Sequence, residues 1–251
     1  MKNKKAQLTI FIIIAIFIIA VVVLFFTLKG TLQKEKPISP ETAEIQNFVQ
    51  ECLDDSLEEV VFKVGENGGY YFPSSAPATT PVLEIPYYIK DNNNLMPRKE
   101  KIQEQISKGV ARELIFCLRD FTIFTNEYEI TKGKINPPEV VIEPERVLVE
   151  LNYPLTIKKG ESHSKIEDFN SEVPVRLGIV YGAVAEFVGE ELKQEGLCLS
   201  CLTDIQGKYT VFIDGHYYKE TDDIIFIAVD KEEYFEKSEE VFKYVFAIEQ
   251  K

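Results

Sequence analysis

Histidine is scarce in this chain of 251 residues, and the short motifs of the common enzyme classes are missing. The two histidines, His163 and His216, stand outside any metal-ligand pattern. The sequence has no nucleophile elbow, no His-Glu-x-x-His zinc motif, no phosphate-binding loop and no dinucleotide fingerprint. The Ser-x-x-Lys spacing from Ser162 to Lys165 falls in a predicted strand and turn, and the Lys-Thr-Gly motif of penicillin-binding enzymes does not accompany it. We therefore expect no catalytic residue, no metal ligand and no cofactor.

Positive charge is also in short supply, with 28 Lys and Arg against 41 Asp and Glu and a formal net charge of −13. So acidic a surface repels the phosphate backbone of nucleic acids at long range, which excludes nucleic acid from the expected partners. The acidic residues do not form the Asp-x-Asp-x-Asp-Gly pattern of a calcium-binding loop. We interpret the acidity as a means of keeping a surface domain soluble.

One long apolar run without charge is present, over residues 7–28. It is long enough to cross a bilayer as a helix, which takes roughly 20 residues. No small-x-small cleavage site follows the run, so we expect it to be retained as an anchor rather than removed as a secretory signal. Lys2, Lys4 and Lys5 precede it and favour a cytoplasmic N-terminus, with the C-terminal domain on the other side of the membrane. Residues 1–29 are thus predicted to be a basic head and a transmembrane anchor.

The residues Lys-Lys-Ala-Gln-Leu-Thr before this run resemble the class III signal peptide of archaeal type IV pilin-like proteins. In that family a prepilin peptidase removes the basic head before a Gln, so the resemblance implies cleavage between Ala6 and Gln7. It also implies a pilus-type assembly machinery as a partner. Phe11 stands where pilins usually carry Glu, and Gly30 interrupts a helix that pilins commonly continue. An uncleaved signal anchor is the alternative interpretation.

Beyond the anchor, the sequence divides into a linker at 30–39 and one extracytoplasmic domain at 40–251. The first part of the domain, 40–121, is predicted to hold two long amphipathic helices. One begins at Pro40 and ends at Gly65, and the other runs from near Arg98 to Phe121. Both carry apolar residues every three or four positions, the spacing of a helix with one buried face.

The second part of the domain, 122–251, has the alternating or β-rich pattern of strands, with a further helix over Val175–Gln194. The expected fold class is therefore α+β, with one N-terminal transmembrane helix, two long amphipathic helices, and a mainly antiparallel sheet with a further helix. The segments LNYPLTIKKG and VPVRLGIVYG look similar to segments of uncharacterised membrane-anchored proteins of small archaea. That likeness implies no activity.

The chain has four cysteines, an even number that is expected to pair outside the cytoplasm. Cys52 and Cys117 each lie on the apolar stripe of a long predicted helix, so their sulfur atoms can meet if the stripes face each other. Among the alternative pairings we favour Cys52–Cys117 with Cys198–Cys201. The second pair also has the spacing of a redox motif, but it follows a predicted helix, and the C-terminal end of a helix does not stabilise a thiolate. We prefer a structural disulfide to a redox site, and a zinc site lacks its further ligands.

Two tyrosine pairs, Tyr70–Tyr71 and Tyr87–Tyr88, lie in a stretch rich in Pro, Gly and Asn. Aromatic rings beside prolines can form a platform for a sugar ring or an extended peptide, and long loops often carry function. The structural alternative is that these tyrosines pack their rings in strands and keep their hydroxyls near water.

Together these observations predict a single-pass membrane-anchored protein of the cell surface with a binding or assembly role, not an enzyme. A pilin-like or minor-pilin-like component is one form of that role. A receptor or adhesion domain that binds a glycan or peptide is the second, and an envelope thiol oxidoreductase or hydrolase is the third. The expected partners are the lipid bilayer, a prepilin peptidase with pilus-type machinery, and a surface glycan or protein.

Overall fold

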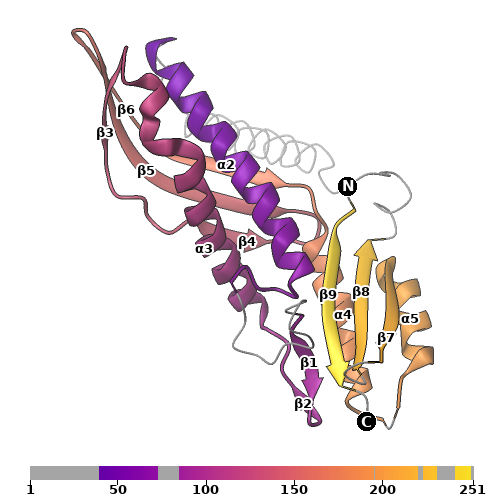
Figure 1. Ribbon diagram of the computed structural model, residues 1–251. Helices are drawn as coiled ribbons and strands as arrows, with labels where there is room; N and C mark the ends of the chain where they lie inside the picture. The colour runs from indigo at the N-terminus through magenta and orange to yellow at the C-terminus, as the bar shows by residue number, and fades with distance from the viewer. Residues whose placement is uncertain (1–39, 73–84, 195, 220–222, 231–240, 250–251) are drawn as a thin grey trace, which may run out of the picture. The chain divides into compact units, whose positions relative to one another are not determined.

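A computed structural model describes residues 40–72, 85–194, 196–219, 223–230 and 241–249 (Figure 1). The predicted membrane anchor, the linker 30–39 and the processing pair Ala6–Gln7 lie outside these residues. The fold below is that of the compact unit Glu44–Lys251, together with the start of α2 at Pro40.

The two long amphipathic helices are present as α2 (Pro40–Glu66) and α3 (Lys99–Leu118). Their periodic apolar residues are fully buried, and each such side chain contributes about 2 kcal/mol through removal from water. The helices approach closely at Gly109, where an added Cβ would lie 2.6 Å from Val60 of α2. The fully buried residues on the two helices are Ile45, Val49, Leu53, Leu57, Val60, Val61, Val64, Ile102, Ile106, Val110 and Leu114.

Helix α3 ends three residues before the predicted Phe121, and the 3-10 segment η1 (Arg119–Phe124) follows. Arg119, Asp120 and Phe121 have φ angles of 42°, 58° and 59°. Residues other than glycine adopt this left-handed conformation at a cost of roughly 1–2 kcal/mol each. Phe121 is nevertheless buried, with its ring 6.2 Å from that of Phe48 on α2, and burial of that ring offsets part of the cost.

The β-rich part begins with a four-stranded antiparallel sheet built around β5 (Val147–Lys159). One edge of β5 pairs with β6 (Ser162–Val173), and the other pairs with β3 (Glu129–Lys132) and β4 (Glu139–Ile142). Alternate residues of β5 are buried, as expected for a sheet with one face on a core. Helices α2 and α3 lie on this sheet (Figure 1): Ser107 of α3 donates a hydrogen bond to the Pro138 carbonyl at 2.6 Å.

A second, five-stranded sheet has the order β2-β1-β9-β8-β7. Its members are β1 (Tyr87–Lys90), β2 (Asn93–Asn94), β7 (Val211–Tyr218), β8 (Asp223–Asp230) and β9 (Lys243–Glu249). Strand β1 runs parallel to β9, while the other pairs are antiparallel. Helices α4 (Leu177–Glu191) and α5 (Leu199–Tyr209) pack on this sheet, and the ring of Phe187 lies 5.0 Å from that of Phe226.

The expected fold class requires correction. The α+β class holds, with four α-helices among the described residues. Within the described ranges, however, no helix combines the length and apolar character needed to cross a membrane. The strands form two sheets rather than one, the second sheet contains a parallel pair, and α5 is a helix beyond those expected from the sequence.

Candidate functional site

The predicted tyrosine platform is wrong for three of its four residues, because Tyr71, Tyr87 and Tyr88 are buried and Tyr70 is half-buried. Tyr88 is in β1 and stacks on Phe246 of β9, with ring centroids 4.8 Å apart. These side chains therefore belong to the core, as the structural alternative holds.

The three buried tyrosines of the predicted platform, Tyr71, Tyr87 and Tyr88, each have a partner for the hydroxyl group. The Tyr88 hydroxyl donates to the Gly68 carbonyl at 3.0 Å and lies 2.7 Å from the Tyr244 hydroxyl. Tyr87 donates to Asp223 at 2.6 Å, and burial with this carboxylate raises the Tyr87 pKa. Tyr71 donates to Glu113 of α3, and burial together with that contact raises the pKa of Tyr71 to about 12. These buried phenols have a structural role, because each hydroxyl keeps its proton and donates it in a hydrogen bond within the core.

The first disulfide, Cys52–Cys117, joins the middle of α2 to the last turn of α3 with a Cα–Cα distance of 5.6 Å. The two cysteines are 65 residues apart in sequence. In the chain-entropy model the closure of so long a loop stabilises the fold by about 4 kcal/mol. This disulfide is one of the two pairs that the sequence favours, and it fixes α2 against α3.

Two adjoining cavities open on the outer side of α2, and both are lined by Asp55 and Glu59. We call them together the α2 groove. The first has a volume of about 520 Å³, extends to η1 and includes the Cys52–Cys117 disulfide through Cys117. The second has a volume of about 720 Å³ and extends along α2 to Glu66 and the start of β9 at Lys243. The volumes of both cavities are within the range of ligand-binding clefts.

Large apolar side chains line the α2 groove beside carboxylates. Phe116 is 61% exposed and Ile123 is 64% exposed, and both lie at the first cavity with Phe48. Phe62 is half-buried in the second cavity. The acidic lining residues are Asp55, Glu58, Glu59, Glu66 and Glu113, and the basic ones are Lys63, Arg119 and Lys243. The groove is thus net acidic and offers apolar contacts at one end.

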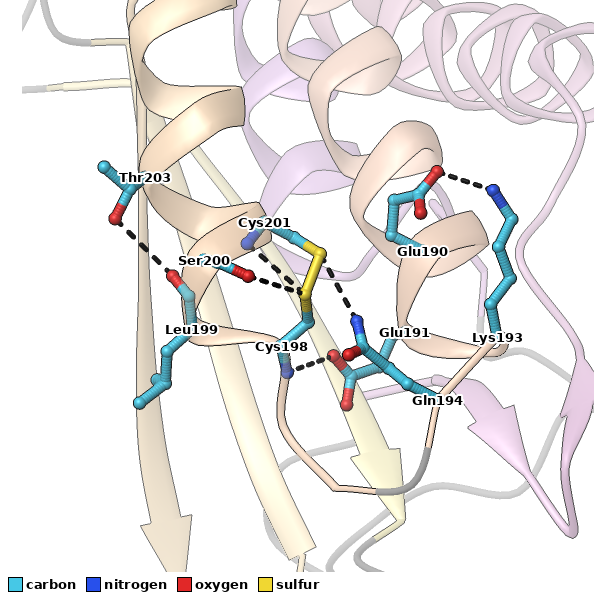
Figure 2. The surroundings of a disulfide bond; sticks show 9 residues. All are labelled: Glu190, Glu191, Lys193, Gln194, Cys198, Leu199, Ser200, Cys201 and Thr203. Carbon is cyan, nitrogen blue, oxygen red and sulfur yellow. Dashed lines mark hydrogen bonds and ion pairs between the residues drawn. A yellow bond between two sulfur atoms is a disulfide. The ribbon is translucent and has the colours of Figure 1, made fainter.

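The second disulfide, Cys198–Cys201, follows α4 as expected, but it also lies at the N-terminus of α5, a helix that was not expected from the sequence (Figure 2). Cys198 is the N-cap residue, and its sulfur accepts a hydrogen bond from the Cys201 backbone N–H at 3.3 Å. The buried Glu191 at the end of α4 accepts the Cys198 backbone N–H at 3.0 Å. Gln194 donates to the Cys201 sulfur at 3.4 Å.

Helix α5 was missed because Gly196 and the cysteine pair suggest a loop. The signal was nevertheless present, since Leu202, Ile205 and Tyr209 recur with the spacing of one helix face. The pair is only three residues apart in sequence, so the chain-entropy model gives this disulfide about 2 kcal/mol, half the contribution of Cys52–Cys117. Because this disulfide stabilises the fold only weakly as a cross-link, we also consider a chemical role for it.

No metal site is found in the part of the chain that the structure describes. Within it, no three His, Cys, Asp or Glu side chains lie together in a group that could hold a metal ion. Ser162 and Lys165 lie in β6 rather than at a helix start, as the strand pattern predicts. No protein-family model, no curated protein and no solved structure matches this chain.

Proposed function

We propose that the chain is a membrane-anchored protein of the cell surface whose extracytoplasmic domain binds a basic, partly apolar polypeptide segment in the α2 groove. The observation that carries the proposal is the α2 groove itself, where exposed Phe116 and Ile123 stand beside the carboxylates of Asp55, Glu59 and Glu113. Exposed apolar side chains rimmed by polar residues are typical of surfaces that a partner covers.

Charge and shape favour a cationic segment. The excess of carboxylates along α2 attracts Lys and Arg side chains and repels acidic ligands, which sets specificity and speeds association. Phe116 and Ile123 offer the aromatic and aliphatic surface that anchors an apolar residue of the partner. A segment that alternates basic and apolar residues satisfies both features.

The Cys52–Cys117 disulfide supports the binding role in a further way. It fixes the two helices that form the first cavity, so the groove needs little ordering when a partner binds, and less affinity is lost to conformational entropy. Both disulfides also suit a protein outside the cytoplasm, where thiols oxidise and stay paired.

The membrane attachment and the pilin-like processing before Gln7 belong to the same proposal, and they rest on the sequence of residues 1–28. The basic head before the apolar run favours a position of the domain outside the membrane by the positive-inside rule, although Lys29, Lys34 and Lys36 follow the run. In a pilin-like assembly, the partner segment would come from another surface subunit. In a receptor, it would come from a ligand.

The test is peptide binding to the full-length chain, measured by fluorescence anisotropy at low and high salt. The probe is a labelled peptide of alternating Lys and Leu, with a Glu and Leu peptide and a neutral oligosaccharide as comparisons. We expect binding of the basic peptide only, weakened by the double variant Phe116→Ser, Ile123→Ser and unaffected by Phe212→Ser. Phe212 is a matched control because it is 50% exposed on β7, away from the α2 groove. Equal binding of the acidic peptide or of the oligosaccharide, or equal loss with Phe212→Ser, would overturn the proposal.

A further inference from the structure

We propose that Cys198 and Cys201 form a thiol–disulfide exchange site for cysteine-containing polypeptides. The inference is independent of the α2 groove, because it rests on residues of α4 and α5 alone. Three observations carry it: the position of the disulfide at a helix N-terminus, the hydrogen bonds to its two sulfur atoms, and the exposed leucines on either side.

The position of Cys198 stabilises the product of exchange. As the N-cap of α5, its sulfur lies at the positive end of the helix and accepts the Cys201 N–H at 3.3 Å (Figure 2). Both features favour a thiolate on Cys198 over a neutral thiol. A sulfur whose thiolate is stabilised is a good leaving group when a disulfide is attacked.

The two sulfur atoms have different surroundings. Cys198 is buried, whereas Cys201 is only half-buried, so an incoming thiolate reaches Cys201 more readily. Gln194 donates to the Cys201 sulfur, and the Glu191 carboxylate holds the Cys198 backbone N–H (Figure 2). Gln194 and Glu191 are positioning residues, because they orient the disulfide without exchanging electrons.

The electron balance of the exchange is complete with a polypeptide dithiol as co-reactant. A substrate thiolate attacks the Cys201 sulfur, a substrate–Cys201 bond forms, and the Cys198–Cys201 bond breaks with its electron pair on Cys198. The second substrate thiolate then attacks the substrate sulfur and releases Cys201 as a thiolate. The substrate loses two electrons and becomes a disulfide, the two electrons reduce the Cys198–Cys201 pair, and the protons of the substrate thiols pass to the released thiolates.

Exposed leucines supply a docking surface for that substrate. Leu197 is 39% exposed and Leu199 is 68% exposed, and they flank Cys198 directly in sequence. A pair of apolar side chains beside a reactive sulfur favours an extended polypeptide with an apolar residue next to its cysteine. A small hydrophilic thiol gains nothing from this contact.

The Cys52–Cys117 disulfide of the same molecule provides an internal control. The oxidised full-length chain is mixed with a synthetic peptide that carries two cysteines and a leucine beside the first, and the reaction is stopped by acid. Alkylation and mass spectrometry then measure the free thiol at each cysteine. We expect Cys198 and Cys201 to be reduced at least about tenfold faster than Cys52 and Cys117. Equal rates at the two disulfides, or reduction of the second pair only on unfolding, would show a structural cross-link and overturn the proposal.

Two variants test the assigned roles. With the peptide in its disulfide form, Cys198→Ser should accumulate a mixed disulfide on Cys201, and serine keeps the N-cap of α5. Leu199→Ser should slow exchange with the leucine peptide by a few-fold and leave exchange with glutathione unchanged. No mixed disulfide with Cys198→Ser would contradict the role of Cys201. An equal effect of Leu199→Ser on the peptide and on glutathione would contradict the docking surface.

Discussion

Removal of the Cys52–Cys117 disulfide should destabilise the domain about twice as much as removal of Cys198–Cys201. The first closes a sequence separation of 65 residues and the second a separation of three, which correspond to about 4 and about 2 kcal/mol in the chain-entropy model. For a domain of this size, 1 kcal/mol shifts the melting temperature by roughly 2–4 °C. The expected losses are therefore about 8–16 °C for Cys52→Ala, Cys117→Ala and about 4–8 °C for Cys198→Ser, Cys201→Ser.

The assay is thermal unfolding of the full-length chain, followed by circular dichroism without reductant. Serine at Cys198 preserves the N-cap of α5, so that the second variant reports mainly on the cross-link. Chemical reduction of all three proteins serves as the control, because with both cross-links broken the two variants should melt close to the wild-type chain. An equal or larger loss for the Cys198–Cys201 variant would refute this reasoning. It would mean that contacts at the start of α5 outweigh loop closure.

The other predictions concern the buried tyrosines and the N-terminus. Tyr87→Phe leaves the buried Asp223 carboxylate without its 2.6 Å hydrogen bond, and chemical denaturation should show a loss of about 1.5–3 kcal/mol; an unchanged midpoint would contradict the pairing. The pKa of Tyr71 is raised to about 12, so its stabilising contribution is complete below pH 10 and is lost as the pH rises through 12. A tyrosinate titration that compares wild type with Tyr71→Phe checks this, and a phenol that ionises near pH 10 would disprove it. Mass spectrometry of the mature protein should find a chain that begins at Gln7, and an intact Met1 would refute pilin-like processing.

The sequence predicted helices and local strand patterns well because their signals are periodic. The apolar residues of α2 and α3 recur every three or four positions, and the structure buries that face. The same periodicity placed Cys52 and Cys117 on the facing stripes that the disulfide joins.

The same periodic signals do not predict which strands pair when they are far apart in the sequence. Strand β1 lies parallel to β9, which is more than 150 residues away along the chain, as the pairing of Tyr87 with Ala247 shows. The local residue pattern of a strand does not indicate which strand it pairs with. The sequence therefore predicted one sheet where the structure has two. The burial of Tyr87 and Tyr88 follows from that pairing, which explains why a surface platform was a mistaken prediction.

The candidate sites depend on similar three-dimensional information. The α2 groove combines residues of α2, α3, η1 and the start of β9, and no short motif marks it. The Cys198–Cys201 spacing was visible in the sequence, but its chemical meaning depended on the helix that follows it. Because α5 begins at Leu199, the pair lies at the positive end of that helix, in addition to following α4.

Binding of the Lys and Leu peptide to the full-length chain tests the proposed role of the α2 groove most directly. The predicted result is saturable binding that weakens with salt and falls by about tenfold or more in Phe116→Ser, Ile123→Ser, with wild-type binding in Phe212→Ser. Binding that is equally strong in all three proteins, or no binding even at low salt, would contradict it.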